Sequence, residues 1–355
     1  MRKHNFSAGP CILAPEVIAG AASAIQNFAD MDLSLIEISH RDKNFVAVMD
    51  EAMALTKELM GLGDDYQVLF LQGGASLQFC MVPYNLMKAG GKAGYTVTGT
   101  WAKKAVEEAK LFGNVDILGT SSDANFNFIP KGYSVGHDLD YFHCTSNNTI
   151  FGTQMKAFPT CEVPLVCDMS SDIFSRQLDF TQFDMIYAGA QKNLGPAGAT
   201  LVAVKPSILG KSGRSIPSML DYQTHIDGES MFNTPPVFSV YTSLLTLRWM
   251  KEQGGLAAME KVNTAKAALL YNEIDRNRLF YGTAAGEDRS DMNACFLLQD
   301  ESHAEVFNAL WKEAGIVGIH GHRSVGGYRA SMYNALPLES VQVLVEVMQH
   351  LEKTH

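Results

Sequence analysis

Short apolar runs alternate with helix-like segments between residues 65 and 205 of the chain. The runs that predict strands lie at 66–71, 94–99, 115–118, 141–144, 164–168, 185–188 and 200–204. Because they are apolar throughout, rather than at every second position, they are typical of strands covered on both faces. Helical patterns follow two of these strands, at 76–88 and 101–112. This alternation predicts an α/β fold with a mostly parallel sheet, whose ligands bind outside the carboxyl ends of the strands.

The pattern changes after residue 205. Residues 206–236 contain Gly, Pro and Ser but few periodic apolar positions, so we expect a long functional loop there. A helix is predicted at 237–252, and a longer helix at 256–278 is placed to join two domains. The remaining α+β pattern predicts strands near 293–299 and 328–333 and helices near 303–314 and 338–352.

The chain is long enough for two domains. Its 355 residues, of which 46% are hydrophobic, can bury a sizeable core, and a chain of this length contains roughly two domains. We expect a large domain of residues 31–255 and a smaller domain built from residues 1–30 and 256–355.

Charge and targeting signals exclude several classes of protein. The net charge of −10 argues against nucleic-acid binding, which requires basic patches, although a few local arginines are enough to bind a small anion. The basic N-terminus is not followed by an apolar segment, and there is no run of about 18 apolar residues, so we expect neither a signal peptide nor a membrane span. The six cysteines show neither CxxC pairs nor zinc-like spacing. We expect reduced thiols, no metal site and a cytoplasmic location.

The most informative segment is 184–203, DMIYAGAQKNLGPAGATLVA, in which an apolar strand runs into Lys192 and a turn rich in Gly and Pro. A lysine at a strand end, surrounded by small residues, leaves space for a flat ring. Removal from water also lets its amine lose a proton and attack an aldehyde, as a pyridoxal-phosphate (PLP) Schiff base requires. Taken alone, the segment also fits a surface lysine in a glycine-rich turn.

Asp168 adds to this evidence, because it ends the apolar run VPLVCD at 163–168. An aspartate at a strand end is either a helix cap or the partner of the pyridinium nitrogen of PLP. In the second role it keeps the ring protonated, so that the ring withdraws electrons from the substrate α-carbon. Asp168 and Lys192 are separated by one strand–connection–strand unit, so both are expected at the same sheet edge.

Three further segments follow strands at this edge. The turn at 71–79, LQGGASLQF, presents a helix N-terminus and the Ser76 hydroxyl to a phosphate, or is a plain strand–helix loop. Trp101 either stacks on a ring or belongs to the core. The Asn-Asn-Thr sequence at 147–149 offers amide and hydroxyl groups, or forms a polar turn.

Two basic pairs complete the candidate chemistry. These are His40-Arg41 and His322-Arg323, and the second is followed by Gly326-Gly327-Tyr328-Arg329. Glycines around arginines free the backbone to bring guanidinium groups onto an anion, and arginine binds carboxylate and phosphate in a bidentate manner. Either pair alone also fits a solvated basic turn.

Together these segments resemble the phosphoserine aminotransferase family, which belongs to the class V, fold-type I PLP enzymes. The resemblance covers nearly the whole chain. Its motifs are NFSAGP at 5–10, SHR at 39–41, the phosphate turn at 72–79, the Schiff-base segment at 189–193, NTPP at 233–236 and GHRSVGGYRAS at 321–331. Ala8 and Ser76 depart from some members, which have serine and arginine there. The resemblance implies a large domain with a mostly parallel, seven-stranded type of sheet flanked by helices, and a smaller α+β domain.

The resemblance also implies a role for each candidate residue. Lys192 carries PLP as a Schiff base, Asp168 pairs with the pyridine nitrogen, and Trp101 stacks on the ring. The other implied cofactor-binding residues are Thr149 on the O3′ side, Ala75, Ser76 and Gln191 around the phosphate, and Asn233 and Thr234 donated to the phosphate by the second subunit. Arg41 is implied to hold the substrate α-carboxylate. The residues implied at the substrate phosphate or side-chain carboxylate are His40, His322, Arg323 and Arg329.

The activity that the resemblance implies is reversible amino transfer between glutamate and 3-phosphohydroxypyruvate, giving 2-oxoglutarate and O-phosphoserine, in a homodimer with shared active sites. A 2-oxo acid phosphate of vitamin B6 biosynthesis, 3-hydroxy-2-oxo-4-phosphooxybutanoate, is a second implied substrate. One alternative is another class V enzyme, such as alanine–glyoxylate aminotransferase or cysteine desulfurase. A desulfurase requires an exposed cysteine on a mobile loop, and no cysteine lies in a Gly/Ser-rich loop of the second half. The other alternative is a PLP-free α/β binding protein.

Overall fold

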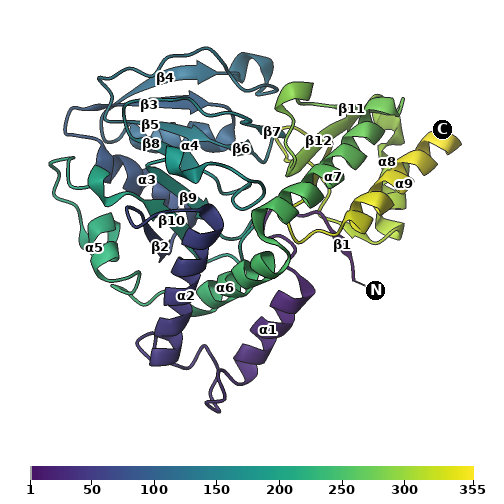
Figure 1. Cartoon of the computed structure of the whole chain (residues 1–355). Coiled ribbons are helices and arrows are strands. Elements are labelled where there is room, and N and C mark those ends of the chain that lie inside the picture. The colour runs from purple at the N-terminus through teal and green to yellow at the C-terminus, as the bar shows by residue number, and fades with distance from the viewer. Residues whose placement is uncertain (1) are drawn as a thin grey trace.

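A seven-stranded sheet forms the centre of the larger part of the molecule (Figure 1). The computed structural model describes residues 2–355. The sheet order is β2-β10-β9-β8-β5-β3-β4, in which β2 is Gln67–Leu71, β3 Lys92–Val97, β4 Asn114–Thr120, β5 Tyr141–Thr145, β8 Leu165–Asp168, β9 Met185–Gly189 and β10 Thr200–Val204. Strand β10 is antiparallel to both neighbours, and the other pairs are parallel. The prediction of a mostly parallel α/β sheet is confirmed.

Helices cover both faces of this sheet, as its apolar strands require. The helices of this part are α1 (Pro15–Gln26), α2 (Lys43–Met60), α3 (Gly74–Leu86), α4 (Thr100–Ala109), α5 (Tyr222–Asp227) and α6 (Val237–Glu252). Helices α3 and α4 pack on the face that carries Leu69 and Tyr187, and α2 and α6 on the face that carries Phe70 and Ile186. For the run at 115–118 the prediction of burial on both faces is wrong. It lies in the edge strand β4, where Ile117 is 43% exposed.

Helix α2 has no counterpart among the predicted elements, although both of its ends carry helix signals. The Asp42 side chain accepts a hydrogen bond from Asn44 N at 2.8 Å and so caps the first turn. Gly61 ends the helix in the left-handed conformation, with φ of 63°. The buried side of α2 includes Phe45 and Met49, which join the core under the sheet.

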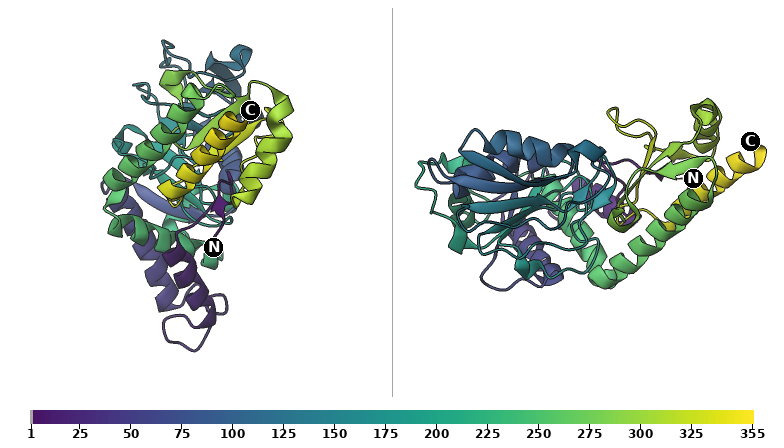
Figure 2. Two further views of the ribbon diagram at one scale, coloured as in Figure 1. Left: turned by 90° about the vertical axis from the view of Figure 1, so that its right-hand side faces the viewer. Right: turned by 90° about the horizontal axis from the view of Figure 1, so that it is seen from above.

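A three-stranded antiparallel sheet organises the second part of the molecule. Its order is β11-β12-β14, with β11 Phe280–Gly282, β12 Asn293–Leu298 and β14 Tyr328–Ser331. Helices α7 (Gly255–Arg276), α8 (Ala304–Glu313) and α9 (Leu338–Thr354) belong to this part, and strand β1 (His4–Asn5) pairs in parallel with β13 (Ile316–Val317). The predicted strands and helices after residue 236 are confirmed, with ends shifted by two residues or fewer. Figure 2 shows α7 extending from the large sheet to this second part.

The two parts have separate apolar cores. The core of the second part contains Phe296, Phe307 and Leu344, together with Phe6 from the N-terminal segment. Helix α1 packs instead against α6 of the larger part. The division into domains 31–255 and 1–30 with 256–355 remains our proposal.

The connection at 206–236 is long, as predicted, but it is not free of core positions. Ile208 and Tyr222 are buried against the sheet, and the Tyr222 hydroxyl donates a hydrogen bond to Gln78 Oε1 at 2.6 Å. The sequence pattern misses them because isolated apolar residues in a polar segment show no period. Exposed positions such as Lys211 and Met219 alternate with these buried ones, and the connection ends in three consecutive exposed residues, Phe232, Asn233 and Thr234.

The remaining elements are short. The hairpin strands β6 (Asn147–Asn148) and β7 (Thr153–Gln154) follow β5. Single 3-10 turns occupy Ser122–Ala124, Phe180–Gln182, Pro206–Ile208, Ser218–Leu220, Gly286–Asp288 and Glu301–His303. All six cysteines are free thiols, as predicted, and Cys144, Cys167 and Cys295 are buried in strands. Within residues 2–355 no helix combines the length and the apolar character that a membrane crossing requires.

Candidate active site

A cavity of about 410 Å³ lies at the carboxyl ends of β2, β8 and β9. It is lined by Pro10, Gly73, Gly74, Ala75, Ser76, Phe79, Trp101, Asp168, Ser170, Gln191, Lys192, Ala197 and Gly198. Six of the predicted site residues are among them, namely Ala75, Ser76, Trp101, Asp168, Gln191 and Lys192. Asp168 and Lys192 meet at one sheet edge because β8 and β9 are parallel neighbours.

Lys192 lies three residues beyond β9, half-buried in the cavity wall. Its Nζ donates a hydrogen bond to Thr149 Oγ1 at 2.8 Å. Removal from water lowers the pKa of Lys192 to about 8, against the opposing effect of the Asp168 carboxylate, and Arg329 acts in the same direction as burial. The amine is therefore partly neutral near neutral pH and able to act as a nucleophile.

Asp168 is the last residue of β8 and is 4% exposed. Its Oδ1 accepts hydrogen bonds from Ser170 N at 2.9 Å and from Ser170 Oγ at 2.6 Å. Burial raises the pKa of Asp168, while Lys192 and the Ser170 bonds oppose this rise. Ser170 is a residue of the site that was not predicted from the sequence, although a serine two residues after an aspartate is a common signal for such a local turn.

The turn between β2 and α3 presents backbone N–H groups to the cavity. Gly73 and Gly74 have positive φ values of 86° and 63°, and α3 begins at Gly74. The first N–H groups of a helix have no intrahelical partner, so the N-terminus of this 13-residue helix attracts an anion. Ala75 and Ser76 lie in this first turn and line the cavity.

Trp101 supplies an aromatic wall opposite the lysine. It is the second residue of α4, and its ring centroid lies 5.5 Å from Lys192 Nζ. The ring is half-buried and lines the cavity, so one of its faces is available to a flat ligand.

Thr149 and Arg329 connect the two parts of the molecule at the cavity. Arg329 Nη1 donates to the Thr149 carbonyl oxygen at 3.4 Å, and the Thr149 hydroxyl receives the bond from Lys192. Arg329 Nε is buried and has no hydrogen-bond partner within residues 2–355. A half-buried guanidinium with an unused donor is suited to bind an anion.

The other predicted substrate residues are less enclosed. Arg41 and Arg323 are exposed, and His322 Nδ1 lies 2.7 Å from Ser324 Oγ. Burial lowers the pKa of His322, and Arg329 and Arg323 add to this effect, so these basic groups gather at one place. His40 Nε2 is buried without a partner within residues 2–355.

Asn233 and Thr234 are exposed at the surface of the single chain. The Thr234 carbonyl oxygen accepts a hydrogen bond from Gln72 Nε2 at 2.6 Å, one residue before the Gly73 turn. Neither residue lines the cavity of its own chain among residues 2–355.

This set of residues fits PLP. The cavity offers an amine of lowered pKa, a buried carboxylate, a flat aromatic wall and a helix N-terminus, which match the aldehyde, the ring nitrogen, the ring face and the phosphate of the cofactor.

The family profile described as Aminotransferase class-V matches residues 3–344. The chain is 67% identical to phosphoserine aminotransferase of Flavobacterium psychrophilum over 353 residues, or 99% of each chain. It is 58% identical to phosphoserine aminotransferase of Parabacteroides distasonis, with both chains fully covered.

Solved structures agree with these matches. The phosphoserine aminotransferase of Bacillus circulans subsp. alkalophilus has a TM-score of 0.96, 43% identity and 99% coverage of both chains. The PLP-bound phosphoserine aminotransferase of Trichomonas vaginalis has a TM-score of 0.93 and 35% identity, with 98% of this chain and 100% of that chain covered. An alanine–glyoxylate aminotransferase of Nostoc shares only the fold, at 16% identity and a TM-score of 0.77.

Proposed function

The chain belongs to the class V aminotransferases and, within them, to the phosphoserine aminotransferases, and from this premise we propose that it transfers an amino group reversibly between glutamate and 3-phosphohydroxypyruvate. The products are 2-oxoglutarate and O-phosphoserine, in serine biosynthesis. As a PLP-dependent transaminase it is not the PLP-free binding protein considered from the sequence. We also propose a cytoplasmic location, which the free thiols support.

PLP, when bound, supplies a ring that withdraws electrons from the substrate α-carbon. In our proposal Lys192 holds the cofactor as a Schiff base and, once released, carries a proton on its Nζ. Asp168 keeps the ring nitrogen protonated, and Trp101 covers one ring face. Thr149 contacts the O3′ side of the ring, and the residues assigned to the phosphate are Ala75, Ser76 and Gln191. The observation that carries this assignment is the amine of lowered pKa in a cavity shared with a buried carboxylate.

We assign the substrate anions to the basic groups. Arg41 would hold the α-carboxylate that all substrates share. The groups assigned to the phosphate or the side-chain carboxylate are His40, His322, Arg323 and Arg329. Support comes from the arginines: within residues 2–355, Arg41, Arg323 and Arg329 form no ion pair. Ion pairs are formed instead by Arg176, Arg248, Arg276 and Arg289. An unpaired guanidinium is stabilised when an anionic substrate arrives.

The test of the reaction compares acceptors for glutamate. The specificity constant of the PLP-loaded protein should be roughly 100-fold or more higher for 3-phosphohydroxypyruvate than for hydroxypyruvate, because a site built for a phosphate is left unpaired without it. The vitamin B6 pathway compound 3-hydroxy-2-oxo-4-phosphooxybutanoate, which carries the same groups, belongs in the panel. Equal constants for the phosphorylated and unphosphorylated acceptors, or a preference for glyoxylate, would contradict the proposal.

The desulfurase alternative has little support from the cysteines. Cys11 lies next to the cavity, where its N–H donates to the Gln191 carbonyl at 3.1 Å. Burial raises the pKa of the Cys11 thiol to about 12, so it does not supply a thiolate near neutral pH.

We further propose a homodimer in which Asn233 and Thr234 reach the cofactor phosphate of the partner subunit. Their exposure at the end of a connection anchored by buried Pro235 supports this arrangement. Mixing a Lys192→Ala variant with an Asn233→Ala/Thr234→Ala variant should restore about a quarter of the wild-type activity after random subunit exchange, because half of the dimers then contain one intact site of two. Demonstrated exchange without any return of activity would refute completion in trans.

A further inference from the structure

We infer that Asn147 is a positioning residue that sets the substrate-side Arg329 relative to Lys192. The inference rests on the proposed functions of those two residues. It begins with the loop between the hairpin strands β6 and β7, where Thr149 contacts both of them. The Thr149 hydroxyl receives the bond from Lys192 Nζ at 2.8 Å, and its carbonyl oxygen receives the bond from Arg329 Nη1 at 3.4 Å. Movement of this loop therefore changes both groups.

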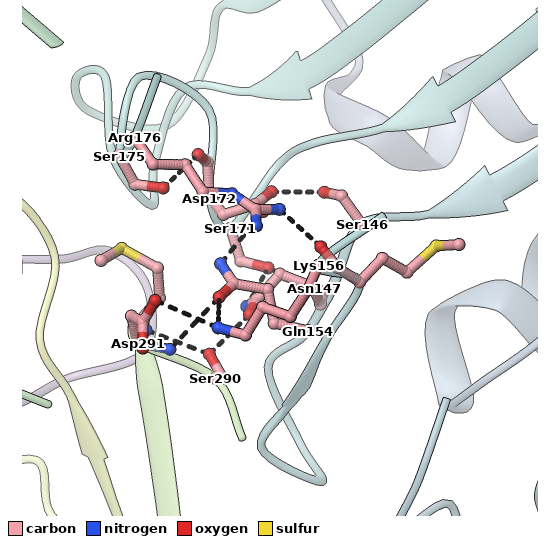
Figure 3. A network of polar contacts seen from close by, with 12 residues as sticks. Ser146, Asn147, Gln154, Lys156, Ser171, Asp172, Ser175, Arg176, Ser290 and Asp291 are labelled. Atoms are coloured by element: carbon pink, nitrogen blue, oxygen red, sulfur yellow. Dashed lines mark hydrogen bonds and ion pairs between the residues drawn. The ribbon is translucent and has the colours of Figure 1, made fainter. Parts of the chain in front are cut away.

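The loop is anchored at its base by the Asn147 side chain, which is 2% exposed. Asn147 Nδ2 donates to Ser171 Oγ at 2.8 Å and to Asn293 Oδ1 at 2.7 Å, and Asn147 Oδ1 accepts from Ser290 Oγ at 2.5 Å. Ser171 follows the Asp168 segment of the larger part, whereas Ser290 lies just before β12 and Asn293 is its first residue. Figure 3 shows Asn147 between Ser171 and Ser290 in this network. A single amide thus joins segments of both parts of the molecule.

The contact continues from Asn293 to Arg329 through the small sheet. Asn293 Nδ2 donates to Ser331 Oγ at 3.0 Å, and the register of β12 and β14 pairs Asn293 with Ser331 and Cys295 with Arg329. Cys295 Sγ in turn contacts the Ile150 carbonyl at 3.4 Å, in the loop that carries Thr149. The loop and Arg329 are therefore held to the same strand.

Asparagine is the residue type that this position requires. Two of its three side-chain bonds use N–H donors, which Asp and Ala lack. A buried hydroxyl or amide that loses its partner costs about 1–3 kcal/mol, so the neighbours of a substituted Asn147 would rearrange to find new partners. Such a rearrangement moves the loop rather than merely weakening the fold.

The same network contains a matched control. Lys156 Nζ bonds Gln154 Oε1 at 2.7 Å and Asp291 Oδ2 at 3.1 Å, so it also joins the two parts of the molecule (Figure 3). Its side chain is 40% exposed, and it has no bond to Asn147 or to the Thr149 loop. Lys156→Met removes this contact and keeps the side-chain stem.

The experiment compares Asn147→Ala and Lys156→Met as PLP-loaded enzymes. Asn147→Ala should lower kcat/KM for both glutamate and O-phosphoserine by roughly 10- to 100-fold, the loss expected when reacting groups shift by about an ångström. It should also shift the midpoint of the pH titration that is followed by the visible absorption of PLP on Lys192. Lys156→Met should leave that midpoint unchanged and kcat/KM within about twofold, whatever its effect on Tm.

A folded, PLP-saturated Asn147→Ala protein with a wild-type midpoint and wild-type constants would overturn the inference, because a purely structural role lowers Tm alone. If Asn147→Ala does not fold, Ser290→Ala decides: it removes one of the three bonds and should give a smaller change of both readouts, and no change overturns the inference. Wild-type enzyme that fails to turn over phosphoserine would contradict the proposed function instead, while the midpoint still tests Asn147.

Discussion

In the proposed active site, the residues assigned to the cofactor (the cofactor end) and those assigned to the substrate (the substrate end) differ in how far a single chain holds them in place. At the cofactor end, Asp168 and Lys192 have hydrogen-bond partners within the chain, in Ser170 and Thr149. At the substrate end, Arg41 and Arg323 are exposed and Arg329 keeps a buried Nε without a partner within residues 2–355. The first set is held in place by the chain itself, whereas in our proposal the second set gains its partners from the substrate.

This difference separates chemistry from recognition. The reaction needs an amine and a carboxylate in fixed geometry, which internal hydrogen bonds provide. In the proposed recognition scheme, positive charges stay unpaired in the free chain, and the anionic substrate compensates for them on binding. Substitutions at the cofactor end should therefore abolish the reaction of every substrate, and those at the substrate end should distinguish between substrates.

The largest effect is expected for Lys192→Ala. It removes the amine that forms the Schiff base, so turnover should fall by several orders of magnitude and borohydride should no longer fix PLP to the protein. Lys205→Ala is the control, because that lysine pairs with Asp184 at the opposite edge of the sheet. A borohydride-reducible adduct in Lys192→Ala would show that another lysine carries the cofactor.

Asp168→Asn should have the next largest effect. The amide is nearly isosteric but cannot keep the ring nitrogen protonated, so kcat should fall on the order of 10³-fold for both glutamate and O-phosphoserine, with weaker retention of PLP. Single-turnover absorbance changes would measure the loss for each substrate. Near-normal turnover would remove Asp168 from the chemistry and, with it, the contrast between the two ends of the proposed site.

The cofactor end is also the end that the sequence predicts better. Asp168 ends β8 and Lys192 lies three residues beyond the parallel strand β9, and an apolar run followed by a small-residue turn is visible without any structure. The start of helix α6 is likewise predictable, because two prolines directly precede it. In these cases the signal is local, since neighbouring residues determine both the element and the turn beside it.

The remaining features depend on contacts between distant residues. Tyr222 is buried through a partner 144 positions away, Gln78, and Asn147 bonds Asn293 across 146 positions. No periodicity in the sequence reports such pairs. The placement of Arg41 and Arg323 is harder still, because their side chains are exposed and few neighbours fix their positions. In our proposal the substrate and a second subunit position them.

Substitutions of the arginines should divide the substrates. Arg329→Ala and Arg323→Ala should each lower kcat/KM for O-phosphoserine, by a factor that corresponds to about 2–5 kcal/mol of activation free energy. The reason is that a dianionic phosphate loses a charge-assisted partner. Arg41→Ala should weaken the binding of glutamate and of O-phosphoserine alike, because both substrates carry an α-carboxylate. Steady-state constants for both substrates in each variant provide the test. An unchanged constant for O-phosphoserine in both Arg329→Ala and Arg323→Ala would break the recognition scheme.

The smallest effect is expected for Ser170→Ala, which sharpens the comparison from the cofactor side. The substitution removes the 2.6 Å hydrogen bond to Asp168 Oδ1 and the 3.1 Å bond that Ser170 Oγ accepts from Gly189 N, and it keeps the bond from the Ser170 backbone N–H to Asp168. One hydrogen bond contributes about 0.5–1.5 kcal/mol, so activity at its pH optimum should fall by about 10-fold at most. Because burial raises the pKa of Asp168 and Ser170 opposes that rise, losing the hydroxyl should raise this pKa further. Activity that requires the carboxylate is lost as pH falls through its pKa, so the acid limb of kcat against pH should move to higher pH.

The control is Ser175→Ala, which removes a buried hydroxyl that bonds the Asp172 carbonyl instead. It should leave the acid limb in place. A limb that stays fixed or moves to lower pH in Ser170→Ala would mean that Asp168 is not the group whose ionisation limits the reaction.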